Sequence, residues 1–336
     1  MNRPITIAGG GLAGLSLGIA LRLRGVPVRV IEAAGYPRHR VCGEFISGIT
    51  DAELDALGIR DLFACAQRHT TTAWFDGEHP MWSRALPAPA YGLSRHFLDA
   101  ALAERFATLG GELRCGERFE DDGEGIVRAA GRAKQDSGWL GLKAHFDGLA
   151  LDADLEIHLK DGGYVGLTRV ENGRVNVCGL FRRREAVGGG HALIAATRDA
   201  GLARLAGRLS EARPVEGSLK GVSHFSLGWQ HGRDEGRVTI GDSAAMIPPF
   251  TGNGMTMAFQ SALAAAEPLA HWSAGVIEWG DAASEIRRAH RRLFARRLGW
   301  ARLLQSLLLH KFGRRFATTL MSLGVVRFET LYRKVR

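Results

Sequence analysis

Three glycines near the start of the chain have the spacing of a phosphate-binding turn. Gly9, Gly11 and Gly14 form a Gly-x-Gly-x-x-Gly pattern between a short apolar run and a helical one. This is the context in which such a turn holds a dinucleotide pyrophosphate. The first glycine permits a tight turn, the second lets phosphate approach the backbone, and the third lets the helix pack against the strand. The free N–H groups at the start of the helix then face the phosphates, so the pattern predicts a dinucleotide site.

An acidic residue follows where the adenosine ribose of such a dinucleotide would lie. Glu32 ends the apolar run after the expected helix. A carboxylate in this position accepts hydrogen bonds from ribose hydroxyls and disfavours a 2′-phosphate. Together with the glycine turn, Glu32 indicates binding of a dinucleotide that has no phosphate on its ribose 2′-hydroxyl.

A second glycine-bearing segment lies more than two hundred residues further on. An apolar run ends in Gly241-Asp242, and a glycine-rich stretch then leads into an alanine-rich helix expected over about 255–272. The N–H groups at that helix start, from Gly252 to Met255, can stabilise an anion by roughly 0.3–2 kcal/mol. The alternative is that Gly241-Asp242 is an ordinary turn and the helix only packs.

These two segments, together with the sequence RHFLD at residues 95–99, make the chain resemble the flavoprotein group of aromatic-ring hydroxylases, flavin-dependent halogenases and geranylgeranyl reductases. The resemblance covers nearly the whole length and implies FAD as the cofactor. It also assigns residues along the cofactor. It implies that Gly9, Gly11, Gly14 and Glu32 bind the ADP half, and that Arg95 and Asp242 reach the ribityl phosphate and hydroxyls. It also implies that Pro249, Gly252, Asn253 and Gly254 border the isoalloxazine ring, and Met255 at the helix start is a further cofactor-binding candidate.

The segment of residues 38–44 is similar to a loop that carries a cysteine near the flavin in the geranylgeranyl reductases. Cys42 is therefore a catalytic candidate, although a small apolar wall residue is an equal alternative. Arg40 is expected to neutralise the pyrophosphate, as is Arg38, unless these side chains are simply solvated. Tyr164 and Pro249 complete the catalytic candidates. No metal site is expected, because the cysteines lack the spacing of metal ligands.

Three departures from the sequence motifs of this group restrict which of its reactions we expect. Its internal Asp-Gly pair is replaced by Ala130-Gly131, and its Tyr-x-Trp-x-Phe-Pro stretch keeps only Tyr164. The Trp-x-Trp pair of the halogenases is absent, which argues against halogenation. We therefore expect a monooxygenase slightly ahead of a C=C reductase, with a non-catalytic flavin-binding protein as a second alternative.

The expected fold class is α/β, with a Rossmann-like FAD-binding domain, an inserted antiparallel β-sheet substrate domain and C-terminal helices. Residues 36–48 look too polar for a core element, residues 112–138 show no clear pattern, and 191–208 look like one helix. Strands with period-two alternation are expected at 139–146, 155–159, 164–168 and 175–181. The predicted domains are 1–70, 93–135 and 230–282 for FAD binding, 71–92 and 136–229 for substrate, and 283–336 for the basic helices.

The substrate is expected between the inserted sheet and the flavin, and the side chains assigned to that wall suggest an apolar small molecule or lipid. Aromatic, polyketide, quinone and prenyl-lipid compounds all fit. The assigned residues are Trp139, Leu142, Phe146, Tyr164, Leu167, Phe225 and Trp229. Because no second Gly-x-Gly-x-x-Gly pattern exists, NAD(P)H is expected as a transient electron donor, with a separate donor as the alternative.

The basic charge is concentrated at one end of the chain. The net charge is +9, yet residues 287–336 contain 14 Lys and Arg and a single acid, Glu329, so the first 286 residues carry 30 basic and 34 acidic residues. This distribution does not suggest nucleic acid binding. It fits either a solvated helix face or peripheral contact with a membrane. Cysteine usage and the lack of a signal peptide suggest the cytoplasm, and the oligomeric state is left open.

Overall fold

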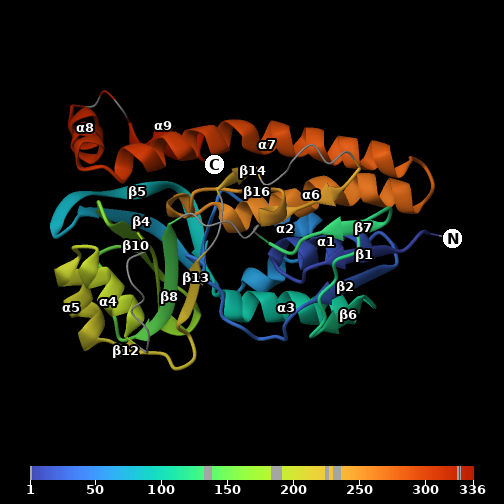
Figure 1. Cartoon of the computed structure of the whole chain (residues 1–336), viewed down its shortest axis with the longest axis horizontal. Helices are drawn as coiled ribbons and strands as arrows, with labels where there is room; N and C mark the ends of the chain where they lie inside the picture. Colours follow the sequence, from blue (N-terminus) through green and yellow to red (C-terminus); the bar gives the residue numbers. More distant parts are fainter. Residues whose placement is uncertain are drawn as a thin grey trace.

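The structure is a computed structural model that describes residues 2–131, 138–182, 191–223, 227–229, 236–323, 325 and 327–336. Two sheets lie side by side along the long axis of the molecule, and the last helices lie across both (Figure 1). The predicted α/β class, with a dinucleotide-type sheet and an inserted second sheet, is confirmed.

The first sheet is parallel and has five strands in the order β15-β7-β1-β2-β6. The strands are β1 (Ile5–Ala8), β2 (Val28–Glu32), β6 (Glu112–Cys115), β7 (Ile126–Arg128) and β15 (Val238–Thr239). Helix α1 (Leu12–Arg22) packs against α3 (Arg95–Thr108) and α6 (Gly254–Ser273). The β1-α1-β2 unit is the predicted one. Residues 112–138, for which no pattern was expected, supply β6 and β7.

The second sheet carries nine strands, in the order β12-β8-β11-β10-β9-β4-β5-β3 with β13 paired to β8. The strands are β3 (Phe45–Ser47), β4 (Gln67–Asp76), β5 (His79–Gly92), β8 (Trp139–Asp147), β9 (Leu155–Lys160), β10 (Gly163–Arg169), β11 (Val175–Arg182), β12 (Arg213–Pro214) and β13 (Lys220–Ser223). The four predicted strands are present. The sheet is not wholly antiparallel, because β4 and β9 pair in parallel.

The expectation that residues 36–48 contain no core element is wrong at their end. Phe45, Ile46 and Ser47 are buried and pair with β5. They are buried because this edge strand packs against the start of α6, where Asn253 and Thr256 donate to the Ser47 carbonyl oxygen, so tertiary packing overrides the polar composition around them.

Helices α4 (Ala192–Asp199) and α5 (Ala203–Glu211) replace the single helix expected over 191–208. Gly201 separates them with φ of +83°, a backbone conformation that ends a helix. The pair covers one face of the second sheet and closes its hydrophobic core.

The remaining elements join and cover these layers. The helices are α2 (Asp51–Ala56), α7 (Trp279–Leu308), α8 (Lys311–Ser322) and α9 (Phe328–Lys334). The short 3-10 turns are η1 (Arg60–Phe63), η2 (Glu171–Gly173), η3 (Gly241–Ser243) and η4 (Pro249–Thr251). A two-stranded sheet pairs β14 (Gly228–Trp229) with β16 (Ala245–Met246). Helix α7 runs along α6 and on toward the second sheet (Figure 1). The predicted boundary between the FAD-binding domain and the basic helices, at residues 282 and 283, lies within the first turns of this helix. Within the described residues, no helix combines the length and hydropathy needed to cross a membrane.

Candidate cofactor site and active site

A cavity of about 400 Å³ lies between the two sheets. One end is formed by the glycine turn after β1 and by Glu32, and the other by side chains of β10, β11 and β13. Its volume lies in the range of cofactor and small-molecule sites. Most of the predicted site residues line it, and the exceptions are Gly14 and Asn253.

The glycine turn has the geometry that its spacing predicts. Gly9 has φ of +115°, and a Cβ at this position would lie 2.4 Å from the Ala129 carbonyl oxygen. A Cβ on Gly14 would lie 1.9 Å from the Gly9 carbonyl oxygen. At Gly11, by contrast, only Arg95 Nη2 comes within 4 Å, at 3.9 Å. The outer two glycines are therefore required by packing, and the middle one leaves its backbone open to the cavity.

Glu32 lies at the carboxyl end of β2, buried against the turn. Its Oε2 accepts a 2.9 Å hydrogen bond from the Gly10 N–H, and its Oε1 accepts one of 3.1 Å from the Ala34 N–H. Arg38 Nη2 lies 2.8 Å from Oε2. The carboxylate is thus fixed at the cavity edge where the resemblance places a ribose.

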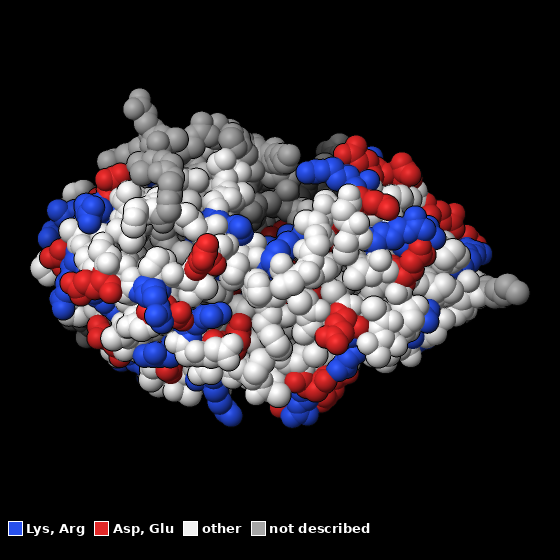
Figure 2. Space-filling model, turned by 90° about the horizontal axis from the view of Figure 1, so that it is seen from below, with Lys and Arg blue, Asp and Glu red and all other residues white. Residues whose placement is uncertain are grey.

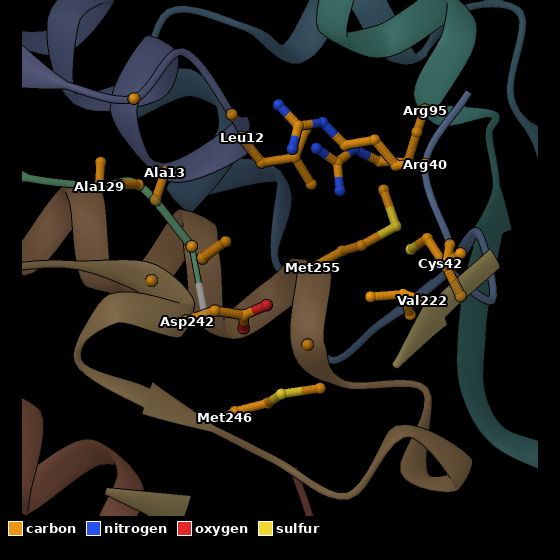
Figure 3. Close-up of a pocket in the computed structure, with 18 of the residues that line it drawn as sticks. Leu12, Ala13, Arg40, Cys42, Arg95, Ala129, Val222, Asp242, Met246 and Met255 are labelled. Atoms are coloured by element: carbon orange, nitrogen blue, oxygen red, sulfur yellow. The ribbon is translucent and has the colours of Figure 1, made fainter. Parts of the chain in front are cut away.

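Beside Glu32, two arginines converge on a fully buried aspartate that sequence reasoning missed. Arg95 Nε donates to Asp99 Oδ1 at 2.6 Å, and Arg40 Nε donates to Asp99 Oδ2 at 3.1 Å. Burial raises the pKa of Asp99, and the guanidinium of Arg95 opposes that shift. Figure 3 shows the Arg40 and Arg95 side chains together at the Leu12 end of the cavity. Three guanidiniums, counting Arg38, face two carboxylates here, which leaves positive charge for a phosphate.

The second glycine-bearing segment forms the opposite wall. Asp242 in η3 lines the cavity, as do Pro249, Gly252, Gly254 and Met255 around the start of α6. Gly252 has φ of +63°, and a Cβ there would lie 2.7 Å from the Phe45 ring. The N-terminal end of a twenty-residue helix therefore points into the cavity.

Asn253 is buried away from the cavity. Its Nδ2 donates to the Ser47 carbonyl oxygen at 2.9 Å, and its Oδ1 accepts from Arg297 Nη1 at 2.9 Å. The side chain therefore ties the start of α6 to β3 and α7. The resemblance placed Asn253 beside the isoalloxazine ring, whereas in the structure its side chain is engaged with Ser47 and Arg297.

Cys42 lines the cavity and lies with Met255 and Val222 in Figure 3. Burial raises the pKa of its thiol, although Arg95 lowers it in part. The side chain is therefore a neutral thiol near pH 7, which is a weak nucleophile. Asn176 Nδ2 holds the loop by donating to the Cys42 carbonyl oxygen at 3.0 Å.

Glu44 is the centre of a buried charge network that no pattern in the sequence indicates. Lys143 Nζ lies 3.1 Å from its Oε1, and His145 Nε2 lies 2.6 Å from its Oε2. Burial raises the pKa of Glu44, but His145 and Lys143 lower it by more. The net shift is therefore downward, and the carboxylate stays charged. The network joins the loop of Cys42 to β8, and it extends to His39, whose Nδ1 lies 3.0 Å from Lys143 Nζ.

The sheet end of the cavity is apolar, with Tyr164, Leu180, Val222 and Met246 in its lining. The Tyr164 ring is buried and lies edge-on to Phe250, with centroids 6.4 Å apart. Burial raises the pKa of Tyr164 well above its usual value, with Cys178 and Cys42 adding to the shift. The hydroxyl therefore remains a neutral donor.

Several residues predicted to face the substrate do not line this cavity. Leu142, Phe146 and Leu167 lie on the other face of the sheet, in the core covered by α4 and α5. The period-two pattern identified the strands but could not say which face meets the cavity. Trp139 packs against the cluster of Tyr164, Leu180 and Met246 without lining the cavity itself. Trp229 is partly exposed, and Phe225 lies outside the described residues.

The segment that departs from the group's Asp-Gly pair still borders the cavity. Ala129, Ala130 and Gly131 all line it, and the Ser243 hydroxyl donates to the Gly131 carbonyl oxygen at 2.8 Å. The segment is therefore fixed against the turn of Asp242 even without the aspartate.

The chain has the FAD-binding fold of flavin-dependent halogenases and monooxygenases. Among solved structures it is similar to the flavin-dependent brominase Bmp2, with TM-score 0.77 and 18% identity over 98% of this chain and 92% of that one. It is also similar to Pseudomonas aeruginosa PqsL in complex with 2-aminobenzoylacetate, with TM-score 0.75 and 15% identity over 94% and 98%. The myxobacterial chondrochloren halogenase CndH gives TM-score 0.69 and 21% identity over 87% and 80%.

No protein-family model matches the sequence, and no curated protein matches it either. At such low identity the structural likeness establishes the fold alone. The same fold serves a brominase and a probable FAD-dependent monooxygenase, so it does not choose between these reactions.

Proposed function

We propose that the cavity binds FAD and that the protein is an FAD-dependent oxidoreductase acting on an apolar substrate, with hydroxylation as its reaction. One observation carries the proposal. The glycine turn, the Arg40–Arg95 pair and the start of α6 come from distant parts of the chain, yet they line a single cavity that ends at an apolar wall.

The residues present fit the parts of FAD in order. The open backbone at Gly11 and the start of α1 suit the pyrophosphate, with Arg40 and Arg95 beside it. Glu32 suits the adenosine ribose, and Asp242 suits the ribityl hydroxyls. The N–H groups at the start of α6 suit the electron-rich edge of a reduced isoalloxazine ring.

The apolar end of the cavity supports a dry reaction space. Bound FAD, once reduced, supplies either activated oxygen for hydroxylation or hydride for C=C reduction. The carbon surfaces of Leu180, Val222 and Met246 exclude water from the substrate side, as oxygen insertion requires. The neutral Tyr164 hydroxyl is available to orient a polar group of the substrate.

We favour an aromatic or quinone-like substrate, with polyketide and prenyl-lipid compounds as further members of the apolar class. A C=C reductase is the second candidate, favoured by the cavity-lining Cys42 and the retained Tyr164. A flavin-binding protein without turnover is the third, and it would fit the loss of the Asp-Gly pair.

The electron donor is part of the proposal. The sequence holds no second glycine turn of this kind, so we propose that NADH or NADPH reduces the flavin by transient binding at the same cleft. A separate reductase is the alternative source of electrons.

A visible spectrum of the purified protein, followed by anaerobic titration with NADH and NADPH, tests these proposals in sequence. We expect flavin absorbance that either nucleotide bleaches and air restores. If only dithionite bleaches the flavin, the proposed direct reduction by NADH or NADPH is wrong, and a separate reductase supplies the electrons. A colourless protein that FAD does not reconstitute would overturn the proposed function. A halogenated product formed in the presence of bromide would show that the reaction is halogenation and not hydroxylation.

A further inference from the structure

Helix α8 buries an arginine and exposes two phenylalanines. Arg314 is 1% exposed and donates from Nε to Asp76 Oδ1 at 3.0 Å. Phe312 and Phe316 on the same helix are 85% and 59% exposed. Surface helices of globular proteins normally bury the apolar stripe and expose the charges. Here the buried face of α8 holds Arg314 together with Met321, and a second apolar face, with Phe312 and Phe316, is left exposed.

The exposed apolar residues form a stripe along one side of α8. Phe312, Phe316 and Leu323 follow each other at helical spacings of four and seven residues, and Leu323 is 70% exposed. We call these three residues the α8 patch. Scattered apolar residues on a surface are ordinary, but an aligned apolar stripe marks an interaction site.

Positive charge accompanies the patch. Lys311 and Arg315 are exposed on the same helix, one residue before Phe312 and Phe316 respectively. The chain from residue 287 onward has 14 basic residues against Glu329. The face shown in Figure 2, by comparison, carries Lys and Arg interspersed with Asp and Glu. Aromatic side chains flanked by cations are the composition that binds the interface of an anionic bilayer.

The position of α8 suits a flat partner. The helix lies near one end of the long axis, above β5 in the view of Figure 1. Its connection to α7 packs into the cluster that includes Tyr164, Leu180 and Met246, three residues of the apolar cavity wall. Through this connection the base of α8 is packed on the second sheet, while the patch itself stays exposed.

We infer that the α8 patch docks the protein on an anionic lipid surface. Phe312, Phe316 and Leu323 enter the boundary between headgroups and acyl chains, and Lys311 and Arg315 contact lipid phosphates. Binding of this kind requires neither FAD nor the proposed reaction, so its test stands apart from theirs.

Vesicle co-sedimentation of the full-length protein tests the inference. We expect the protein to sediment with vesicles of phosphatidylcholine mixed with phosphatidylglycerol, and weakly with phosphatidylcholine alone. The Phe312→Ser/Phe316→Ser variant should lose about tenfold or more in affinity, because two apolar rings no longer enter the lipid. Lys311→Glu/Arg315→Glu should lose the preference for anionic vesicles.

Val276→Ser is the matched control, because Val276 is 67% exposed and lies outside the patch. It should sediment like the wild type, and all variants should keep the wild-type melting temperature. Failure of the wild type to bind anionic vesicles would overturn the inference. Equal binding by the Phe312→Ser/Phe316→Ser variant would do so too, as would patch-dependent binding of single-stranded RNA or of a protein in place of vesicles.

Discussion

At the glycine-turn end of the cavity, charged side chains face one another across short distances, whereas at the sheet end Leu180, Val222 and Met246 present only carbon and sulfur. The charged end combines the β1-α1-β2 unit, whose glycine turn is fixed by backbone geometry, with Arg40 from the next loop and Arg95 from α3. The apolar end is built from a sheet whose inward side chains depend on strand register. A turn defined by backbone constraints specifies its ligand closely, and a wall of side chains specifies only a class of substrate.

The largest effect that would test this contrast is expected at Gly14. In Gly14→Ala the new Cβ would lie 1.9 Å from the Gly9 carbonyl oxygen, so α1 must shift from the turn. We expect the free energy of unfolding of the FAD-free protein to fall by about 1–3 kcal/mol, as for overpacked cores. Urea denaturation followed by circular dichroism measures it.

Gly11→Ala is the matched partner of that substitution. Gly11 has φ of −85° and open space beside it. We expect the FAD-free stability to stay within about 0.5 kcal/mol of the wild type, while FAD affinity falls because the pyrophosphate meets a methyl group. Equal destabilisation by the two substitutions would contradict the distinction between packing and ligand-facing glycines.

A smaller effect is expected at Arg40, which tests whether the charged end binds phosphate. Arg40→Gln removes a guanidinium that is 34% exposed, so the fold should tolerate it. We expect FAD affinity to fall about tenfold, the value of one charge-assisted hydrogen bond. Arg40→Lys should retain part of the affinity, and that part should weaken with salt. Unchanged FAD fluorescence titrations with Arg40→Gln would remove this residue from the site.

The network of Glu44, Lys143, His145 and His39 gives a pH-dependent stability. Burial and the neighbouring Lys143 lower the pKa of His39 from 6.5 to about 3. The unfolded chain therefore binds a proton below about pH 6.5 that the folded protein does not bind until about pH 3. Stability must fall as the pH is lowered through this window.

His39→Gln keeps an acceptor for Lys143 and removes the titrating ring. We expect its melting temperature to decline less than that of the wild type between pH 6.5 and the onset of acid unfolding. The exposed His79 provides the control, His79→Gln. Parallel curves for the His39→Gln variant and the wild type would show that His39 does not contribute to acid sensitivity.

The parts of the site that the sequence predicted are those set by local patterns. The glycine turn, Glu32 and the start of α6 each lie within one short stretch, so spacing and periodicity were sufficient. Strands β3 and β7 have three residues each, and their burial comes from neighbouring elements. The pairing of Glu44 with His145 spans 101 residues, and no single-sequence pattern encodes it. The wrong assignment of Leu142, Phe146 and Leu167 has the same origin, because alternation leaves the choice of face to tertiary packing.

The smallest effect is expected at Cys42, which lies between the two ends. Because burial raises the pKa of its thiol, we expect Cys42→Ala to lower turnover by less than about tenfold, as for a wall residue that performs no proton or bond transfer. Alkylation by iodoacetamide gives an independent measurement. Exposed Cys65 and Cys115 should react first near pH 7, and Cys42 should react only as the pH rises. Rapid labelling of Cys42 at pH 7, together with loss of turnover in a Cys42→Ala variant that still binds FAD, would identify a reactive thiolate and make the middle of the cavity a second chemical centre.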